Sequence, residues 1–191
     1  GQKVEYIIAQ SAKQGPIRVD LNCRATVPCL WAVGDVSFGG SAFSGALAPC
    51  SHGGDGMFVA EVMGYRAGLD AADFAATAAT PEIDPAEART LKDQVFAPLE
   101  RKSGIEPQDA IYRIQEAVIP IKYNVIRSGE RMQEALSKVE EVKGLLPTLW
   151  AKDLHNLVKC HEAAAMVICA EMTYKPALMR QERRGTHMSE D

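Results

Sequence analysis

The chain has 191 residues, enough for one domain or two small ones with a sizeable core. It carries 21 basic and 25 acidic residues, and the net charge of -4 argues against nucleic acid as the main partner, because phosphate binding needs a basic face. No apolar run reaches the ~18 residues of a membrane span, and the N-terminus lacks the basic and apolar regions of a signal peptide. We therefore expect a cytoplasmic protein without a direct membrane span.

The first third of the chain contains the β-like segments. These are "VEYIIA" (residues 4–9), the alternating "PIRVDL" (16–21) and "LWAVGDV" (30–36), separated by turn-forming glycine and proline. The third segment is an apolar run that ends in Gly34 and Asp35. This pattern is typical of a buried strand whose carboxyl end presents backbone and a carboxylate to a ligand, the usual place for cofactors in α/β proteins.

A glycine-rich stretch follows this predicted strand. Most of the fifteen glycines fall between Gly34 and Gly68, and many lie in "GDVSFGGSAFSGALAPCSHGGDG". Glycine has no Cβ and tolerates positive φ, so such a loop can bring backbone N–H groups close to a ligand. From Met57 an alanine-rich sequence with apolar residues at helical spacing predicts one long helix.

The proline-containing "ATPEIDP" (residues 79–85) predicts the end of this helix and a domain boundary. We expect one domain over residues 1–79 and a helical domain over residues 80–191. In the second domain, "PAEARTLKDQVFAPLERKSG" predicts an amphipathic helix that ends at Gly104. The next helix is expected to have Pro107 in its first turn and Pro120 at a bend or end.

Two further helices complete the prediction. Ser128 is a candidate N-cap for the helix that contains "GERMQEALSKVEEVKGLL", in which Met132, Leu136 and Val139 share one face. The last helix begins near Lys152, with a kink expected at Pro176. Its predicted core-facing residues are Leu154, Leu157, Met166, Cys169 and Met172. The predicted fold class is α+β, a small β-containing part followed by an antiparallel bundle of three to four helices.

The cysteines and histidines predict no metal site. The five cysteines form no C-x-x-C pair, and an odd number rules out a complete disulfide framework, so we expect reduced and mostly buried thiols. His155 and His161 flank Cys160, but a spacing of six residues does not bring two ligands together on one helix face.

Three segments carry a family resemblance, in the same order along the chain. The segment "RATVPCLWAVGDV" is similar to a T-x-V-P-G-L-Y-A-A-G-E/D segment of the flavoprotein subunits of the fumarate reductase, succinate dehydrogenase, aspartate oxidase and adenylylsulfate reductase superfamily. The glycine-rich loop and helix resemble the segment that wraps the flavin there. The C-terminal "MRQERRGTHMSED" is similar to the family's R-x-E-S-R-G-x-H-x-R-x-D segment.

The resemblance implies FAD in the full-length protein. The phosphate-binding G-x-G-x-x-G turn, which lies near the N-terminus of a much longer chain in this family, does not occur here. We therefore interpret the chain as a fragment: the C-terminal half of a split FAD-binding domain (residues 1–79) followed by the helical domain. This fragment alone is expected to bind no FAD and to be inactive, with the missing N-terminal half as its first partner.

The cofactor-binding candidates are Gly34, Asp35, Ser44, Gly45 and Ala46. The Asp35 carboxylate can accept hydrogen bonds from ribityl or ribose hydroxyls, although an aspartate that caps a loop has the same sequence pattern. Gly34 allows a close approach. Backbone N–H groups around Gly45 are candidates for the pyrimidine edge of the flavin, where donors stabilise charge on reduced flavin; a plain surface loop is the alternative.

Departures from the family pattern leave the catalytic residues and the substrate open. Ser11 lies near the place of the histidine that binds substrate in fumarate reductases and succinate dehydrogenases, and Ser51 or His52 lies near the place of their substrate-binding arginine. A serine supplies no charge-assisted pairing for a dicarboxylate. The stretch "GGSAFSGALA" is closer to adenylylsulfate reductase α subunits.

The basic C-terminal segment has two interpretations. Arg180, Arg183 and Arg184 lie close together beside Glu182, in a region that packs back on the FAD domain in the family. We prefer a solvated helix end whose cations lie near the negative end of the helix dipole.

Two functions remain after the sequence analysis. The first is part of an FAD-dependent oxidoreductase that passes electrons between a small-molecule substrate and a partner such as an iron–sulfur subunit. The second is a non-catalytic helical interaction module that docks a partner through an exposed apolar face.

Overall fold

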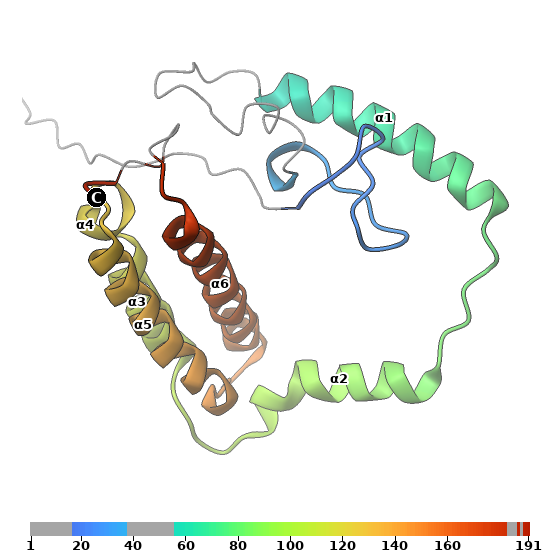
Figure 1. The fold of residues 1–191 in the computed structure, drawn as a ribbon. Coiled ribbons are helices and arrows are strands. Elements are labelled where there is room, and N and C mark those ends of the chain that lie inside the picture. Colours follow the sequence, from blue (N-terminus) through green and yellow to red (C-terminus); the bar gives the residue numbers. More distant parts are fainter. Residues whose placement is uncertain (1–16, 38–55, 183–186, 188) are drawn as a thin grey trace, which may run out of the picture. The chain divides into compact units, whose positions relative to one another are not determined.

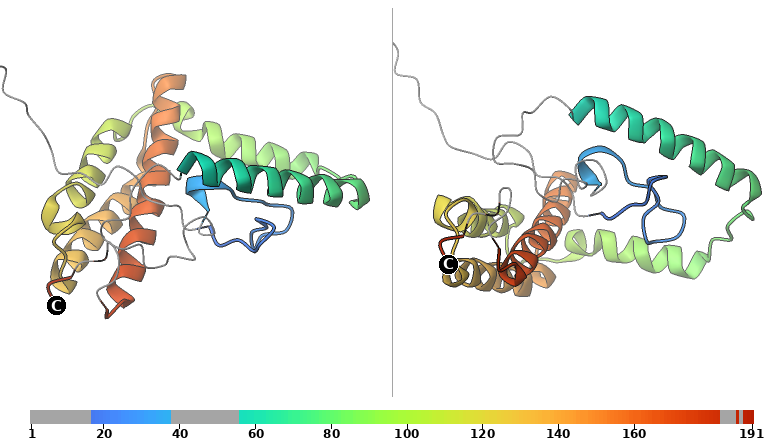
Figure 2. Two further views of the ribbon diagram at one scale, coloured as in Figure 1. Left: turned by 90° about the horizontal axis from the view of Figure 1, so that it is seen from above. Right: turned by 45° about the horizontal axis from the view of Figure 1, so that its top comes forward.

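The computed structural model describes residues 17–37, 56–182, 187 and 189–191. The chain divides into two compact units, Gly1–Thr80 and Pro81–Asp191. Figures 1 and 2 show their helices, which are coloured along the sequence. Each unit is described separately below.

Unit 1 contains the long helix α1, Gly56–Thr77, which confirms the predicted helix after the glycine-rich stretch. Beside it lies the segment 17–37, which ends in the short 3-10 helix η1, Gly34–Val36 (Figure 1). The predicted strand over residues 30–36 is wrong. Within the described residues, this segment pairs only through isolated bridges such as Arg24 with Trp31 and Ile17 with Ser37.

Backbone conformation explains the missing strand. Cys23, Cys29 and Gly34 all have positive φ, of 66°, 62° and 63°. Each left-handed residue turns the chain, so the extended pieces between them are too short to extend a ladder. The segment "VEYIIA" lies outside the described residues.

Unit 2 begins with α2, Pro85–Glu100, which has Asp84 as its N-cap: the carboxylate accepts a hydrogen bond from the Ala86 amide at 2.8 Å. The helix ends four residues before the predicted stop at Gly104. Beyond it the chain is extended and pairs with residues 148–150, since the Ile105 amide donates to the Thr148 carbonyl at 3.1 Å. A Cβ on Gly104 would lie 2.1 Å from that carbonyl oxygen, so this glycine permits a close backbone approach and does not end the helix.

The remaining elements are α3 (Pro107–Val118), α4 (Ile121–Asn124), α5 (Gly129–Leu145), η3 (Leu146–Thr148) and α6 (Leu154–Met179). Pro107 opens α3, and Pro120 precedes α4, so both prolines lie at helix boundaries as predicted. The Ser128 hydroxyl accepts from the Arg131 amide at 3.3 Å, which confirms the predicted N-cap. Helices α3, α5 and α6 lie side by side in both figures and pack together as the predicted bundle.

The bundle has two buried clusters. The larger one contains Ile114, Val139, Val142, Leu157 and Val167, and the smaller one contains Tyr123, Met132, Leu136 and Tyr174. The face predicted for α6 is partly wrong, because Leu154, Cys169 and Met172 are exposed. The buried stripe runs instead through Leu157, Cys160, Ala163, Val167, Ala170, Tyr174 and Ala177. Its alanines have small side chains, which allow α6 to pack closely against its neighbours.

Candidate functional site

The predicted cofactor residues Gly34 and Asp35 lie in η1, which packs against the beginning of α1 (Figure 1). A Cβ on Gly34 would lie 3.2 Å from the Cβ of Ala60, so the backbone here approaches α1 more closely than a side chain would comfortably allow. Only the backbone of Asp35 is described. Ser44, Gly45 and Ala46, like Ser11, Ser51 and His52, lie outside the described residues.

Ser37 fixes the turn that follows Gly34. The Ser37 side chain is buried, and its hydroxyl donates to the Gly34 carbonyl at 2.8 Å while its amide donates to the same oxygen at 3.0 Å. The Ile17 amide donates to the Val36 carbonyl at 3.3 Å, which holds the other side of η1. The turn is therefore set by backbone hydrogen bonds, and residues 34–36 have one defined position in unit 1.

A polar clip, formed by Arg24, Trp31 and Asp70, fastens the segment 17–37 to α1. The Asp70 carboxylate accepts from Arg24 Nε at 2.5 Å and Nη2 at 2.9 Å, and from Trp31 Nε1 at 2.7 Å. The hydrogen bond from Arg24, followed by the one from Trp31, holds the pKa of Asp70 below its ordinary value. Trp31 also meets Phe74 edge to face, with ring centroids 5.5 Å apart.

The sequence analysis missed this clip. Arg24 and Asp70 are 46 residues apart, and no local pattern connects them. The one available signal was Trp31 in an apolar run, because a buried indole N–H usually needs an acceptor. The clip has a functional consequence, since it determines where η1 meets α1.

The beginning of α1 can receive a polar ligand. The first amides of a helix have no intrahelical partners, and the helix dipole favours negative charge there. The first turn of α1 contains no acidic residue that would oppose such a charge. A left-handed glycine turn beside a helix N-terminus suits a large polar cofactor such as FAD, which needs close backbone contact and hydrogen-bond donors. The described residues of unit 1 therefore fit this group.

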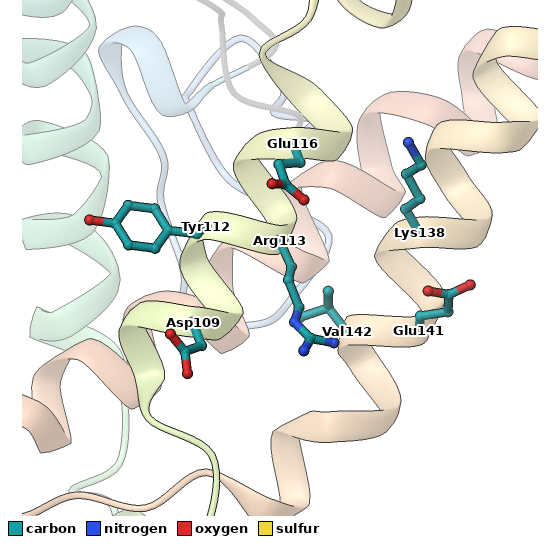
Figure 3. A pocket seen from close by; sticks show the side chains of 7 residues that line it. All are labelled: Asp109, Tyr112, Arg113, Glu116, Lys138, Glu141 and Val142. Atoms are coloured by element: carbon teal, nitrogen blue, oxygen red, sulfur yellow. The ribbon is translucent and has the colours of Figure 1, made fainter.

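Unit 2 has a groove of about 540 Å³ between α3 and α5, shown in Figure 3. Its lining residues are Asp109, Tyr112, Arg113, Glu116, Lys138, Glu141 and Val142. Charges of both signs line it, and of the seven residues only Val142 is buried. The groove is therefore an open polar surface without a desolvated reactive group.

The histidines and cysteines of α6 have structural surroundings. His161 Nε2 lies 3.0 Å from the carbonyl of Val95 on α2, and burial raises the pKa of the Cys160 thiol. Within the described ranges, no three metal-binding side chains come together. The same part of the chain contains no helix with the length and apolarity needed to cross a membrane.

Arg180 and Glu182 lie just beyond α6. Arg180 Nη1 is 4.0 Å from Glu182 Oε1, a loose ion pair between partly exposed side chains. Arg183 and Arg184 lie outside the described residues. The sequence analysis also gave no role to Arg127 or His187, which are buried near this end of α6.

Comparisons with known proteins agree on one group of enzymes. Residues 116–191 match the family described as "Fumarate reductase flavoprotein C-term". An uncharacterized FAD-dependent oxidoreductase of Methanocaldococcus jannaschii is 26% identical over the whole chain, which covers 34% of that protein. A subunit of the fumarate reductase (CoM/CoB) of Methanothermobacter marburgensis is 28% identical over 93% of the chain and 31% of the relative.

Solved structures show the same likeness. Mycobacterium smegmatis Sdh1 in complex with UQ1 is 28% identical and has a TM-score of 0.80, over 91% of this chain and 29% of that one. Adenylylsulfate reductase of Archaeoglobus fulgidus shares the fold, with a TM-score of 0.66 at 24% identity over 87% of this chain and 27% of that one. The chain thus spans about a third of the length of the curated relatives it matches.

Proposed function

The chain belongs to the superfamily of fumarate reductase and succinate dehydrogenase flavoproteins, and we propose that it is the C-terminal portion of an FAD-dependent oxidoreductase subunit. In this proposal residues 1–79 are one half of an FAD-binding domain, and residues 80–191 are the helical C-terminal domain. The observation that carries it is the packing of η1 against the beginning of α1, which brings a left-handed glycine and a helix N-terminus together.

The surface of α1 supports the same division of labour. Met57, Val62, Tyr65 and Leu69 are large apolar residues of α1 whose side chains are exposed. Apolar side chains gathered on one helix usually pack against another element. The relatives are about three times as long as this chain, so the remainder of such a protein would supply the covering surface.

We assign the cofactor contacts as follows. The Asp35 carboxylate accepts hydrogen bonds from ribityl or ribose hydroxyls, and Gly34 allows the backbone to come close. The backbone around Ser44, Gly45 and Ala46 meets the pyrimidine edge of the flavin. FAD supplies the chemistry of accepting and releasing a hydride, and the protein contributes binding, orientation and hydrogen-bond donors.

The parent protein would act on a small molecule, and its electron partner would be an iron–sulfur subunit. Fumarate or succinate fits poorly, because Ser11 and Ser51 or His52 stand near positions where the family has substrate-binding cations. A substrate nearer to that of adenylylsulfate reductase suits the "GGSAFSGALA" stretch better. We propose the reducing cytoplasm as its location, which is compatible with the free cysteines of the described part.

A flavin-binding experiment tests the proposal. The 191-residue chain and a longer protein with the N-terminal segment found in the relatives are each titrated with FAD, and flavin absorbance and fluorescence are followed. We expect binding only to the longer protein, and weaker binding after Asp35→Ala. Asp20→Ala, which removes an aspartate that caps a turn of the same segment, is the matched control and should bind FAD like the unsubstituted protein.

Two results would count against the proposal. A longer protein without bound flavin would favour the helical interaction module, whose partner would dock on the exposed apolar residues. Catalysis by the 191-residue chain alone would contradict the split of the FAD site over two parts of the protein.

A further inference from the structure

Arg127, between α4 and α5, is a buried cation without a carboxylate partner. Its side chain is part of a residue that is only 8% exposed, and its Nε donates to the Asn124 carbonyl at 2.8 Å. No carboxylate of the described residues lies within ion-pair distance of it. Burial lowers the pKa of Arg127, which shows that the charged form is poorly solvated. A buried charge is costly unless an opposite charge compensates it.

His187 is a second polar group without full compensation in the same place. It is also 8% exposed, and its Nε2 is buried without a hydrogen-bond partner among the described residues. Burial, followed by the charges of Arg127 and Arg180, lowers the pKa of His187, and a hydrogen bond with the Arg180 backbone opposes this effect. The imidazole is therefore neutral near pH 7, and one ring nitrogen remains available.

The acidic residues nearby are engaged elsewhere. The Glu190 amide donates to the Arg127 carbonyl at 2.7 Å, but its carboxylate accepts from Arg131 Nη1 at 2.7 Å. The Asp191 carboxylate accepts from the Gly129 amide at the start of α5. These contacts fasten residues 189–191 to α5 and leave Arg127 without a negative partner.

We propose that Arg127, Arg180 and His187 form a binding site for an oxyanion, either a phosphate or a carboxylate. Arg127 and Arg180 supply charge-assisted hydrogen bonds, for which guanidinium groups are well suited. His187 takes up a proton when the anion binds and donates from Nε2 to one of its oxygens. Tyr174 is not a donor to this site, because its hydroxyl already donates to the Ala117 carbonyl at 2.9 Å.

The anion has two possible sources with the same chemistry. One is a free anion from solution, and the other is a carboxylate side chain of the longer protein. In either case binding and protonation are coupled, because an anion compensates the two arginines and stabilises the imidazolium. Affinity therefore rises as the pH falls toward the ordinary histidine pKa of about 6.5.

The test follows the titration of His187 by NMR, with its signals identified through His187→Gln. The 191-residue chain is titrated in chloride, in inorganic phosphate and in acetate at constant ionic strength. We expect millimolar phosphate or acetate to raise the pKa of His187. Arg127→Gln and Arg180→Gln should each weaken this response by about tenfold, because each removes a charge-assisted pair. The exposed Arg113→Gln on α3 is the matched control and should leave it unchanged.

The longer protein distinguishes the sources. A pKa of His187 that is already raised there, insensitive to phosphate and lowered by Arg127→Gln, identifies a carboxylate of the protein as the occupant. A response to phosphate in both proteins identifies a free anion. The proposal is overturned if neither anion shifts the titration in the 191-residue chain and Arg127→Gln leaves it unchanged in the longer protein. Arg180→Gln gives an independent reading if Arg127→Gln alters folding.

Discussion

The two units of the chain differ in how they bury apolar surface. Unit 2 contains two clusters of buried side chains from α3, α5 and α6 and from the short α4. In the described part of unit 1, the buried apolar residues are Cys23, Ala32 and Ala67, all small. Its segments are joined mainly by the polar clip of Arg24, Trp31 and Asp70. The comparison indicates that unit 2 encloses its own core, whereas unit 1 presents a surface on which another part of the protein can pack.

The largest expected effect tests the core of unit 2. Ile114→Ala removes a side chain that is 1% exposed, and the cavity should lower the free energy of unfolding of unit 2 by about 2–5 kcal/mol. Denaturant unfolding followed by circular dichroism measures it. The matched control is Ile168→Ala on the exposed side of α6, where the residue is 54% exposed and the effect should stay within about 0.5 kcal/mol. Equal losses at the two positions would show that unit 2 lacks a packed core.

A second prediction concerns the turn at the candidate site. Gly34→Ala places a Cβ at φ 63° and 3.2 Å from Ala60, so it should destabilise unit 1 by roughly 1–2 kcal/mol. Hydrogen exchange of residues 31–37 should become faster while that of α5 stays the same. Gly64→Ala in α1 meets no atom within 4 Å and should be neutral or stabilising, since alanine favours the helix. Unchanged exchange in Gly34→Ala would mean that the left-handed turn is not required.

Tyr174 gives a prediction for alkaline pH. Burial raises its pKa to about 12, above the unfolded value of about 10. This contribution to stability is present below pH 10 and is lost as the pH rises through the folded pKa. Tyr174→Phe should cost about 1 kcal/mol at neutral pH through the lost hydrogen bond to Ala117, and it should remove this part of the alkaline loss. Tyr112→Phe, at an exposed position, should change neither quantity.

The smallest effect is expected for the clip in unit 1, because its ion pair is partly exposed. Asp70→Asn should loosen the segment 17–37, which the fluorescence of Trp31 reports in a Trp150→Phe background. The pKa of Asp70 is lowered in the folded protein, so its contribution is present above about pH 4 and disappears as the pH falls through the folded pKa. The two proteins should therefore become alike in acid. A difference that persists there would point to lost hydrogen bonding with Trp31 instead of charge.

Helix positions could be predicted from the sequence because their signals are local. Asp84, Pro107 and Ser128 mark helix starts through short-range hydrogen bonding or fixed φ, and all three occur where a helix begins. The buried face of α6 was less accessible. Large apolar residues such as Leu154 and Met172 suggested one face, but alanines at the contacts with α3 and α5 determine which side is buried.

The site was only partly predictable for a related reason. Gly34 and Asp35 stand out because a glycine and an acid end an apolar run, but the run forms a 3-10 turn and no strand. The positive φ at Cys23 and Cys29 that prevents a ladder has no sequence signal, since cysteine is not enriched in left-handed conformations. The clip and the pair of Arg127 and His187 each join residues far apart in the chain, which no local pattern shows.

The most direct test of the account is hydrogen exchange in the longer protein with and without FAD. If η1 and the beginning of α1 form half of the cofactor site, FAD should slow exchange at residues 34–37 and 56–64. Residues 107–145 of the helical bundle should be unaffected. Slower exchange confined to the bundle, or no change at η1 and α1 while flavin is bound, would contradict the assignment of residues 1–79 to the FAD-binding domain.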